Sequence, residues 1–374
     1  KDLNNSKKIK IPLNLTLDSN LQHLIREELI QAKLDFRNVG SAAILMDVKN
    51  GEILSLISLP DYDLNKRTSI NSSIYTNKIT LGVYELGSVF KTFTIAAALE
   101  NKLVEPNTIF KNLETSLNCD KYMIKEHDKL PKNLSTEQIL IRSSNIGAVR
   151  IAQKIGIERY KDFLNNLGLL DTINFDLEEV GTPLSFKWGK CKLATTAFGH
   201  GITTTPLQLA KAYAILGNGG YKIEPHILKK NKKTLEKREQ IISSTTSKSM
   251  NLMLRKVVSL SEGTANFANI KGYEVGGKTG TALKYNSNGK LNTFVSLFPA
   301  SNPEYVLLVM LDDPKGAPDF IYQFPPNEKY PEGYKYKGEK RNTSGWNAVV
   351  VAGKIIQKIG PILAIKNLQA ANKF

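Results

Sequence analysis

The sequence predicts an α+β fold in which one antiparallel sheet takes its strands from both ends of the chain. Two observations support this prediction. Strand-like segments stand near the N-terminus and again after residue 270. Between them, residues 85–270 carry helical patterns separated by capping and breaking residues, which predicts a large helical insertion beside the sheet. A doubly wound parallel sheet is excluded, because strand and helix do not alternate along the chain.

Each predicted strand is an apolar run bounded by residues that favour turns. Asn50-Gly51 separates the first two runs and predicts a type I′ hairpin turn, since this dipeptide tolerates positive φ. Asn288-Gly289 marks a turn between the third and fourth runs. The predicted strands cover Ala42–Val48, Glu52–Leu59, Glu274–Tyr285, Thr293–Pro299 and Tyr305–Leu311.

The predicted helices carry apolar residues at helical spacing. Asp18 or Ser19 can cap the first helix, because both side chains accept hydrogen bonds from backbone N–H groups. Residues 313–345 are rich in Pro, Gly, Tyr and Lys, and we expect an irregular loop there. The predicted helices cover Leu21–Leu34, Ser88–Glu100, Thr136–Arg142, Asn145–Ile155, Pro206–Leu216, Ser247–Ser259 and Trp346–Ile359.

We expect one large domain at residues 19–365, after an N-terminal linker at 1–18 and before a C-terminal tail at 366–374. Its sheet strands are expected at about 41–59 and 274–311. No apolar run reaches the about 18–20 residues that span a bilayer. Because the chain begins with Lys and shows no signal peptide, we expect that an N-terminal segment has been removed.

Charge and cysteine content limit the classes of partner. The formal net charge of +16 favours an anionic partner in principle. The lysines are spread along the chain without a nucleic-acid-binding motif, so we expect no nucleic-acid partner. Cys119 and Cys191 form neither a CxxC nor a zinc-ligand spacing, and they can be either a disulfide or two separate thiols.

The histidines show no metal-ligand spacing, so no metal site is predicted. Only His200, which lies between two glycines, is considered for a role at the edge of a site. The favoured interpretation is that His200 is a turn residue.

The first chemical motif opens an apolar helix and places Lys91 three residues after Ser88. A serine hydroxyl is a poor nucleophile without a nearby base, and this spacing puts the lysine amine on the same helical face. Gly87 allows a tight turn into the helix, whose N-terminal N–H groups can stabilise an oxyanion. Alone, the motif is weak, because a capped helix with a solvated lysine gives the same pattern.

The second motif is Ser143-Ser144-Asn145, at the junction of two predicted helices. A hydroxyl here can relay a proton, and the Asn145 amide can both donate to and accept from a peptide. Taken alone, a serine-rich N-cap is the favoured explanation of this motif.

The third motif, Lys278-Thr279-Gly280-Thr281, lies in a predicted strand. A second lysine can hold a carboxylate and can oppose protonation of Lys91. A glycine lets substrate backbone approach the strand. A phosphate-binding P-loop is excluded, because the required glycine is replaced by Tyr273.

The three motifs in this order are the signature of the serine penicillin-recognising enzymes. Their separations, 55 residues from Ser88 to Ser143 and 135 from Ser143 to Lys278, resemble those of class B penicillin-binding proteins. The resemblance covers roughly residues 10–365 and is strongest to the septal FtsI type, penicillin-binding protein 3. The similar flanking segments are Ser41–Pro60, Arg142–Gly147, Gly199–Ala210 and Ser344–Asn347. The chain departs from the family at Leu86, where proline is common, and we expect little consequence.

The resemblance implies the fold and the activity. The implied fold is a five-stranded antiparallel sheet flanked by helices, with an all-helical subdomain. The implied activity is peptidoglycan D,D-transpeptidation through an acyl-serine, without a cofactor, and with covalent inhibition by β-lactams. Implied partners are pentapeptide stems, an acceptor amine and division-complex membrane proteins, including a lipid-linked glycan polymerase. The implied location is the periplasm, as part of a protein anchored in the inner membrane by a segment absent from this chain.

The resemblance also implies residue roles. Lys91 would deprotonate Ser88, while Ser143 and Asn145 would relay the proton and orient the substrate. Backbone N–H groups of Ser88 and Thr281 would bind the oxyanion. The implied site residues are Ser88, Lys91, Ser143, Asn145 and Lys278 for catalysis, and Thr279, Gly280 and Thr281 for binding substrate or β-lactam.

Other readings of the same motifs remain. An elongation-type penicillin-binding protein shares all of them. A serine β-lactamase would need a base for deacylation, and Glu262 with Asn266 gives only a superficial E-x-x-x-N pattern that lacks the usual leucine. A β-lactam sensor domain is generally shorter, and an inactive scaffold would not be expected to keep all three motifs.

Overall fold

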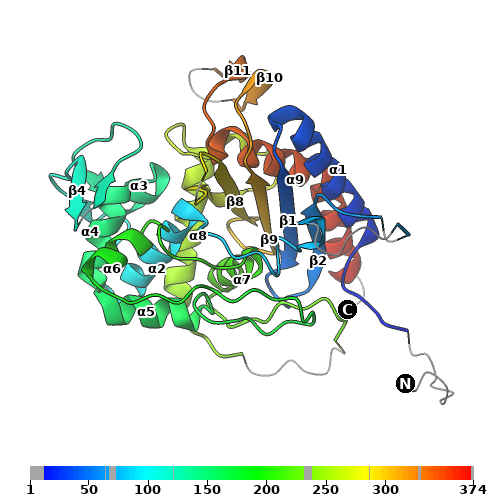
Figure 1. The fold of residues 1–374 in the computed structure, drawn as a ribbon, viewed down its shortest axis with the longest axis horizontal. Helices are drawn as coiled ribbons and strands as arrows, with labels where there is room; N and C mark the ends of the chain where they lie inside the picture. The colour runs from blue at the N-terminus through cyan, green and yellow to red at the C-terminus, as the bar shows by residue number, and fades with distance from the viewer. Residues whose placement is uncertain are drawn as a thin grey trace.

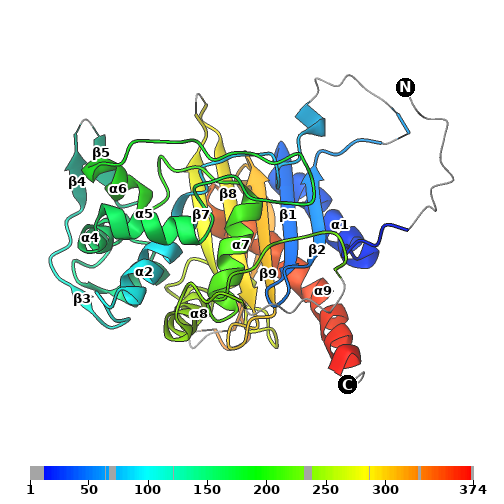
Figure 2. The same ribbon diagram turned by 90° about the horizontal axis from the view of Figure 1, so that it is seen from below.

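The computed structural model describes residues 12–63, 65–66, 73–120, 122–230, 238–285, 287–326 and 330–371. Residues 1–11 of the predicted linker lie outside this part. A five-stranded antiparallel sheet forms the centre of the molecule, in the order β2-β1-β9-β8-β7 (Figure 1). Helices α1 and α9 cover one face and α7 and α8 the other, while a group of helices lies beyond the β7 edge (Figure 2). The predicted α+β class is confirmed.

The sheet joins the two ends of the chain, as the sequence predicts. β1 pairs with β9 in antiparallel register, with Ile44 opposite Leu308. Both strands are buried almost throughout, because helices cover both faces of the sheet. The edge strand β2 alternates between buried and half-buried residues. The strands are β1 (Gly40–Asp47), β2 (Ile53–Leu59), β7 (Gly276–Leu283), β8 (Lys290–Phe298) and β9 (Tyr305–Asp312).

The helices begin at residues that cap them. The Asp18 carboxylate accepts the N–H groups of Asn20 and Leu21 at the start of α1. Thr205 and Gln208 form a capping box at α7. The helices are α1 (Ser19–Phe36), α2 (Lys91–Glu100), α3 (Thr136–Ile141), α4 (Asn145–Ile155), α5 (Ile157–Asn166), α6 (Lys190–Thr196), α7 (Pro206–Gly217), α8 (Ser244–Ser259) and α9 (Ala348–Ala371). Short 3₁₀ turns are η1 (Ser73–Tyr75), η2 (Gly87–Phe90), η3 (Asn266–Ala268) and η4 (Ser344–Trp346).

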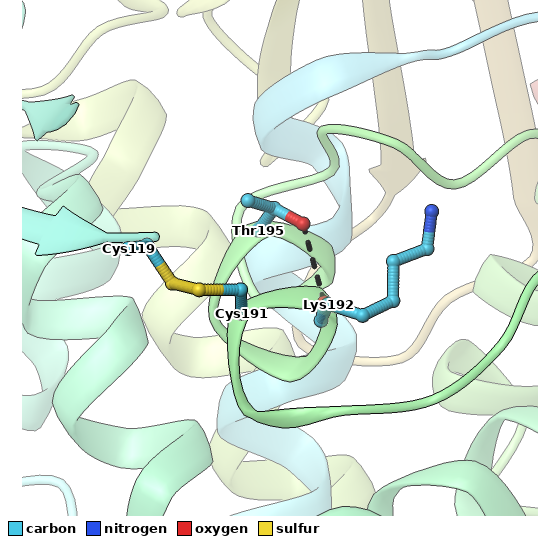
Figure 3. Close-up of a disulfide and its surroundings, with 4 residues drawn as sticks. All are labelled: Cys119, Cys191, Lys192 and Thr195. Carbon is cyan, nitrogen blue, oxygen red and sulfur yellow. Dashed lines mark hydrogen bonds between the residues drawn. A yellow bond between two sulfur atoms is a disulfide. The ribbon is translucent and has the colours of Figure 1, made fainter. Parts of the chain in front are cut away.

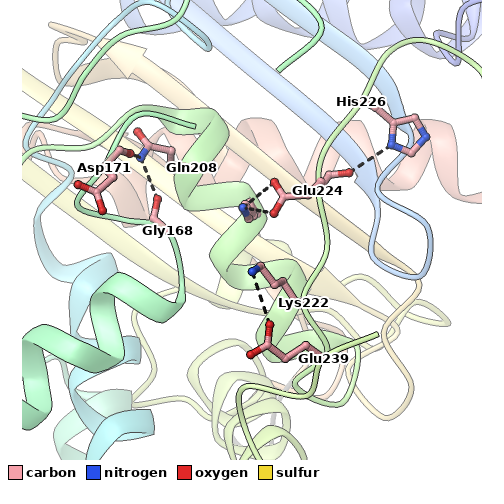
Figure 4. Close-up of polar contacts among 8 residues, drawn as sticks. Gly168, Asp171, Gln208, Lys222, Glu224, His226 and Glu239 are labelled. Atoms are coloured by element: carbon pink, nitrogen blue, oxygen red, sulfur yellow. Dashed lines mark hydrogen bonds and ion pairs between the residues drawn. The ribbon is translucent and has the colours of Figure 1, made fainter. Parts of the chain in front are cut away.

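Helix α7 is buried along its whole length, so its polar side chains need partners inside the protein. The Gln208 amide donates to the carbonyls of Gly168 and Asp171 at 2.8 and 2.6 Å (Figure 4). The Lys211 ammonium donates to both carboxylate oxygens of Glu224 at 2.8 and 2.7 Å. These contacts fasten the irregular segments on either side of α7 to the face of the sheet.

The insertion is not wholly helical, which corrects the prediction for residues 85–270. Two small antiparallel pairs lie within it, too short to show a strand period in the sequence. They are β3 (Ile109–Phe110) with β6 (Leu134–Ser135), and β4 (Ser116–Cys119) with β5 (Tyr122–Lys125).

The predicted irregular loop at 313–345 is also wrong in part. It contains a hairpin, β10 (Ala317–Phe324) and β11 (Tyr334–Glu339), which stands above the sheet (Figure 1). Aromatic packing stabilises this hairpin: the Tyr322 ring contacts Trp346 edge-on at 5.2 Å between centroids. Composition concealed the strands, because the prolines and glycines lie at the turns and strand ends.

The first hairpin turn and the last helix differ from prediction in detail. Only Gly51 of Asn50-Gly51 has a positive φ, at 82°, so the turn is not type I′. Helix α9 continues past Pro361 to Ala371 and is longer than predicted. Among the described residues, α9 alone is long and apolar enough to cross a membrane by length and composition. Its most apolar window is 61% buried inside the protein, as in a core helix.

Candidate active site

Ser88 is half-buried and lies in the 3₁₀ turn η2, which leads directly into α2. The Lys91 N–H donates to the Ser88 carbonyl, so the two residues are one helical turn apart. Gly87 has a φ of 65°, in the left-handed region that a side chain would oppose. The turn that the first motif predicts is therefore present.

Two other segments press against the Ser88 turn. A Cβ atom on Gly280 of β7 would lie 2.1 Å from the Leu86 carbonyl oxygen. A Cβ atom on Gly199 would lie 1.9 Å from the Gly87 carbonyl oxygen, and Gly199 has a φ of 82°. Only glycine lets backbone approach so closely. The serine turn is thus held between the third motif and the loop at 199–201.

Ser143 is the point where the three motifs meet. Its hydroxyl accepts hydrogen bonds from the Lys91 ammonium and the Lys278 ammonium, each at 3.0 Å. The Lys91 ammonium also donates to the Ser143 carbonyl. Ser143 has a φ of 58°, a left-handed conformation that is uncommon for serine and is concentrated at functional sites.

Both lysines are fully buried, and this burial controls their protonation. Desolvation lowers the pKa of Lys91 to about 7, against the opposing effect of the Glu126 charge. Desolvation and the positive charge of Lys91 hold the pKa of Lys278 well below its usual value. Because the two lysines repel each other when both are protonated, the site disfavours two positive charges at once.

The other residues of the second motif make structural contacts. Ser144 is the N-cap of α4, and its hydroxyl accepts the Gly147 N–H at 2.9 Å. The Asn145 amide donates to the Lys125 carbonyl at 2.8 Å, and its buried Oδ1 lacks a hydrogen-bond partner among the described residues. The Asn145 Oδ1 atom at the start of α4 is therefore available to accept a hydrogen bond. The predicted catalytic role of Asn145 stays a prediction.

The threonines of the third motif are each joined to a neighbouring segment. The Thr279 and Thr264 hydroxyls share a hydrogen bond of 2.9 Å. The Thr281 hydroxyl accepts the Ser344 N–H at 3.1 Å. These contacts set the outward edge of β7 beside the turn η4.

A cleft of about 580 Å³ opens over this edge. Ser143, Thr279 and Thr281 are among the residues that line it, whereas Lys91 and Lys278 are fully buried. Aromatic residues also line the cleft. They include Phe267, Phe324 and Trp346, with the Arg341 guanidinium 4.4 Å from the Trp346 ring centre.

His200 and Glu262, which the sequence analysis considered as possible site residues, each form a polar contact with a neighbouring side chain. His200 Nδ1 lies 3.2 Å from the Glu85 carboxylate, and this hydrogen bond raises the pKa of His200. Glu262 forms an ion pair of 2.5 Å with Arg142, so its carboxylate is engaged at the rim and does not line the cleft.

Cys119 of β4 and Cys191 of α6 form a disulfide, with Cα atoms 5.4 Å apart (Figure 3). This resolves the alternatives that the sequence left open. Among the residues that the structure describes, no group of three potential metal ligands occurs.

Sequence reasoning missed several charged residues at the site, among them Glu126. The Glu126 carboxylate accepts the Ser144 hydroxyl at 2.6 Å and the Asn145 N–H at 2.8 Å. No sequence motif predicts a role for Glu126, because it follows a four-residue strand and is 18 positions from its partner Ser144. An acidic residue placed to cap a helix that carries a motif is visible only in the fold.

Comparison with known proteins agrees with this geometry. Residues 41–323 match the family described as penicillin binding protein transpeptidase domain. The chain is similar to the probable peptidoglycan D,D-transpeptidase FtsI of Caulobacter vibrioides (strain NA1000 / CB15N), with 31% identity over 95% of this chain and 59% of that protein. It is also similar to stage V sporulation protein D of Bacillus subtilis (strain 168), with 33% identity over 83% of this chain and 51% of that protein.

A solved structure has the same fold. The apo transpeptidase domain of Burkholderia pseudomallei penicillin-binding protein 3 aligns with a TM-score of 0.77 at 26% identity, covering 93% of this chain and 96% of that one. The chain spans about half the length of the curated relatives it matches. The family match, the relatives and the fold together identify the chain as a member of the penicillin-binding protein transpeptidase domain family, in its class B branch.

Proposed function

We propose that this chain is a peptidoglycan D,D-transpeptidase that acts through an acyl-serine at Ser88. One observation carries the proposal: the Ser143 hydroxyl joins Lys91 and Lys278 at 3.0 Å each, beside the turn that holds Ser88. A nucleophile, a lysine of lowered pKa and a hydroxyl relay are the groups that acyl transfer from a peptide requires.

In the first half-reaction, Lys91 as the free amine takes the proton from the Ser88 hydroxyl. The Ser88 oxygen attacks the penultimate D-Ala carbonyl of a pentapeptide stem and forms a tetrahedral oxyanion. The C–N bond to the terminal D-Ala then breaks, and the departing amine takes its proton from Lys91 through the Ser143 hydroxyl. Lys91 returns to the free amine, and the acyl group stays on Ser88.

Two sets of groups bind the reacting substrate. The Thr279 and Thr281 hydroxyls and the Lys278 ammonium hold the terminal carboxylate, whose charge would raise the pKa of Lys278 and keep it protonated. The N–H groups of Ser88 and Thr281 stabilise the oxyanion. The close approach of Gly280 to the Leu86 carbonyl, and of Gly87 to Thr281, supports this proposal, because the segments that carry the two N–H groups are neighbours.

In the second half-reaction, the amine of a neighbouring stem attacks the acyl carbonyl and loses a proton to Lys91. The ester bond to Ser88 breaks, the serine oxygen regains that proton, and an amide cross-link is released. This chemistry requires neither a metal nor an organic cofactor. β-Lactams would acylate Ser88 by the same first step.

In the cell, we propose a role in septal wall synthesis, as the periplasmic domain of a protein anchored in the inner membrane. Its partners would be division-complex membrane proteins, including a lipid-linked glycan polymerase. The FtsI name of the Caulobacter relative supports the septal role. The alternative is a class B protein of another wall-building system, such as elongation. The sporulation name of the Bacillus relative shows that similar proteins also take part in processes other than division.

The reaction is tested with a pentapeptide stem donor and an excess of an amine acceptor. We expect D-Ala release and an amide product with the wild-type chain, and neither with Ser88→Ala. Ser249→Ala, which changes a half-buried serine of α8, is the matched control and should react normally. Product formation by Ser88→Ala would refute the assignment, and D-Ala release with hydrolysis in place of amide formation would show a hydrolase.

A further inference from the structure

The hairpin β4–β5 ends at the second motif. Glu126 directly follows β5, and its carboxylate reaches the first turn of α4. One oxygen accepts the Ser144 hydroxyl at 2.6 Å and the Ile146 N–H at 2.9 Å, and the other accepts the Asn145 N–H at 2.8 Å. Two of the N–H groups that a helix leaves free at its start are thus satisfied from outside the helix.

The neighbouring residue adds a further contact, because the Lys125 carbonyl accepts the Asn145 amide at 2.8 Å. Residues 125 and 126 therefore hold Ser144, Asn145 and Ile146 through four hydrogen bonds. Ser143 comes directly before this fixed group and has the left-handed φ of 58°. Its hydroxyl can meet both lysines only while that backbone conformation is maintained.

Glu126 also brings a negative charge toward the buried amine of Lys91. Burial lowers the pKa of Lys91, and the Glu126 charge acts in the opposite direction. The other titratable groups that interact electrostatically with Lys91 are Lys278, which it repels, and His127, whose pKa is lowered by burial and by the Lys91 charge. Among the described residues, Glu126 is therefore the group whose charge favours the protonated form of Lys91.

The hairpin that carries Glu126 is tied to the other side of the site. Cys119 of β4 is joined to Cys191 of α6 (Figure 3). The chain continues from the end of α6 at Thr196 to Gly199. Gly199 is the residue packed against the Gly87 carbonyl, beside Ser88. The disulfide therefore links the segment that holds the second motif to the segment that supports the serine turn.

We propose that Glu126 is a positioning residue for the acyl-transfer site and that the disulfide Cys119–Cys191 holds its hairpin in place. Glu126 fixes the start of α4, which keeps Ser143 between the two lysines, and its charge raises the pH at which Lys91 becomes a free amine. This inference rests on the proposed function.

The charge is tested by Glu126→Gln, using the rate constant for acylation by a fluorescent penicillin as a function of pH. Without the negative charge Lys91 loses its proton at lower pH, so we expect the acidic limb of the profile to shift to lower pH. A purely structural role would lower the rate at every pH and leave the limb in place. The control is Glu137→Gln, a glutamate of α3 that pairs with Lys256, which should reproduce the wild-type profile.

The positioning is tested by Glu126→Ala. We expect the acylation rate constant at saturation to fall roughly 10- to 100-fold, the scale of a displaced catalytic group, with little change in penicillin affinity. Hydrogen exchange at the Asn145 and Ile146 amides should become faster, and this readout needs no activity. Wild-type exchange and a wild-type rate would overturn the proposal.

The disulfide is tested with the Cys119→Ser, Cys191→Ser double variant and with wild type treated with dithiothreitol. Both should acylate more slowly than the oxidised wild type and should show faster exchange at the same two amides. Equal rates and equal exchange would overturn the tethering role. Failure of the wild type itself to form an adduct would refute the proposed function, whereas an acylated wild type with unaffected variants would refute only this inference.

Discussion

Lys91 is the residue whose chemistry depends most on the fold. It is fully buried, it begins α2, and it donates to the hydroxyl and carbonyl of Ser143. A solvated lysine would be almost entirely protonated at neutral pH. Burial lowers the pKa of Lys91 to about 7, so a large fraction of the amine is free there.

This pKa predicts how acylation depends on pH. Lys91 takes a proton only as the free amine, and its folded-state pKa lies below its ordinary value, so activity should be present above about pH 7 and lost as the pH falls below it. The measurement is the second-order rate constant for acylation by benzylpenicillin between pH 5 and pH 9. A rate that stays constant across this range would show that Lys91 is not the base.

The residues of the three motifs were visible in the sequence, whereas their electrostatic surroundings were not. The spacing of Ser88 and Lys91 predicted one helical turn, and the structure has it. Glu126 could not be predicted, because its contact with α4 joins residues 18 to 20 positions apart through a hairpin too short to show a pattern. A local signal identifies a motif, but only the tertiary fold identifies the charges around it.

At the scale of elements, the site is formed where β7, the turn η2 and the loop at 199–201 meet. Strands with long apolar runs were predicted correctly, since their burial dictates their composition. The hairpin β10–β11 was missed, because its strands alternate aromatic and exposed polar residues among glycines and prolines. Phe324 of β10 nevertheless helps to line the cleft.

The contact between β7 and η2 predicts the effect of Gly280→Ala. The added methyl group would lie 2.1 Å from the Leu86 carbonyl oxygen, so β7 and the serine turn must move apart. We expect acylation to slow by about 100-fold, the scale of a displacement of about 1 Å, while the protein stays folded. The check is the acylation rate constant together with the melting temperature.

The matched control for this variant is Gly189→Ala. A Cβ atom on Gly189 would meet no heavy atom within 4 Å, so this change should leave acylation unaltered. If Gly280→Ala acylated as fast as Gly189→Ala, the close packing of β7 on the serine turn would have no catalytic importance.

At the scale of the whole molecule, the sheet and the insertion contribute different parts of one site. The sheet supplies Lys278 through Thr281 on the edge strand β7, and the insertion supplies Ser88, Lys91 and Ser143. The order of strands and helices along the chain was sufficient to predict this division. The contacts across it depend on close glycine packing, such as that of Gly280 on Leu86, which a single sequence does not determine.

The most direct test of the central claim, that Ser88 is the acylated residue of a transpeptidase, is intact-mass spectrometry after incubation with benzylpenicillin. The wild-type chain should gain the mass of one penicillin, keep it over hours, and carry it on the peptide that contains Ser88. Ser88→Ala should gain nothing. An adduct on Ser88→Ala, or an adduct on wild type that is lost within seconds as penicillin is hydrolysed, would contradict the account.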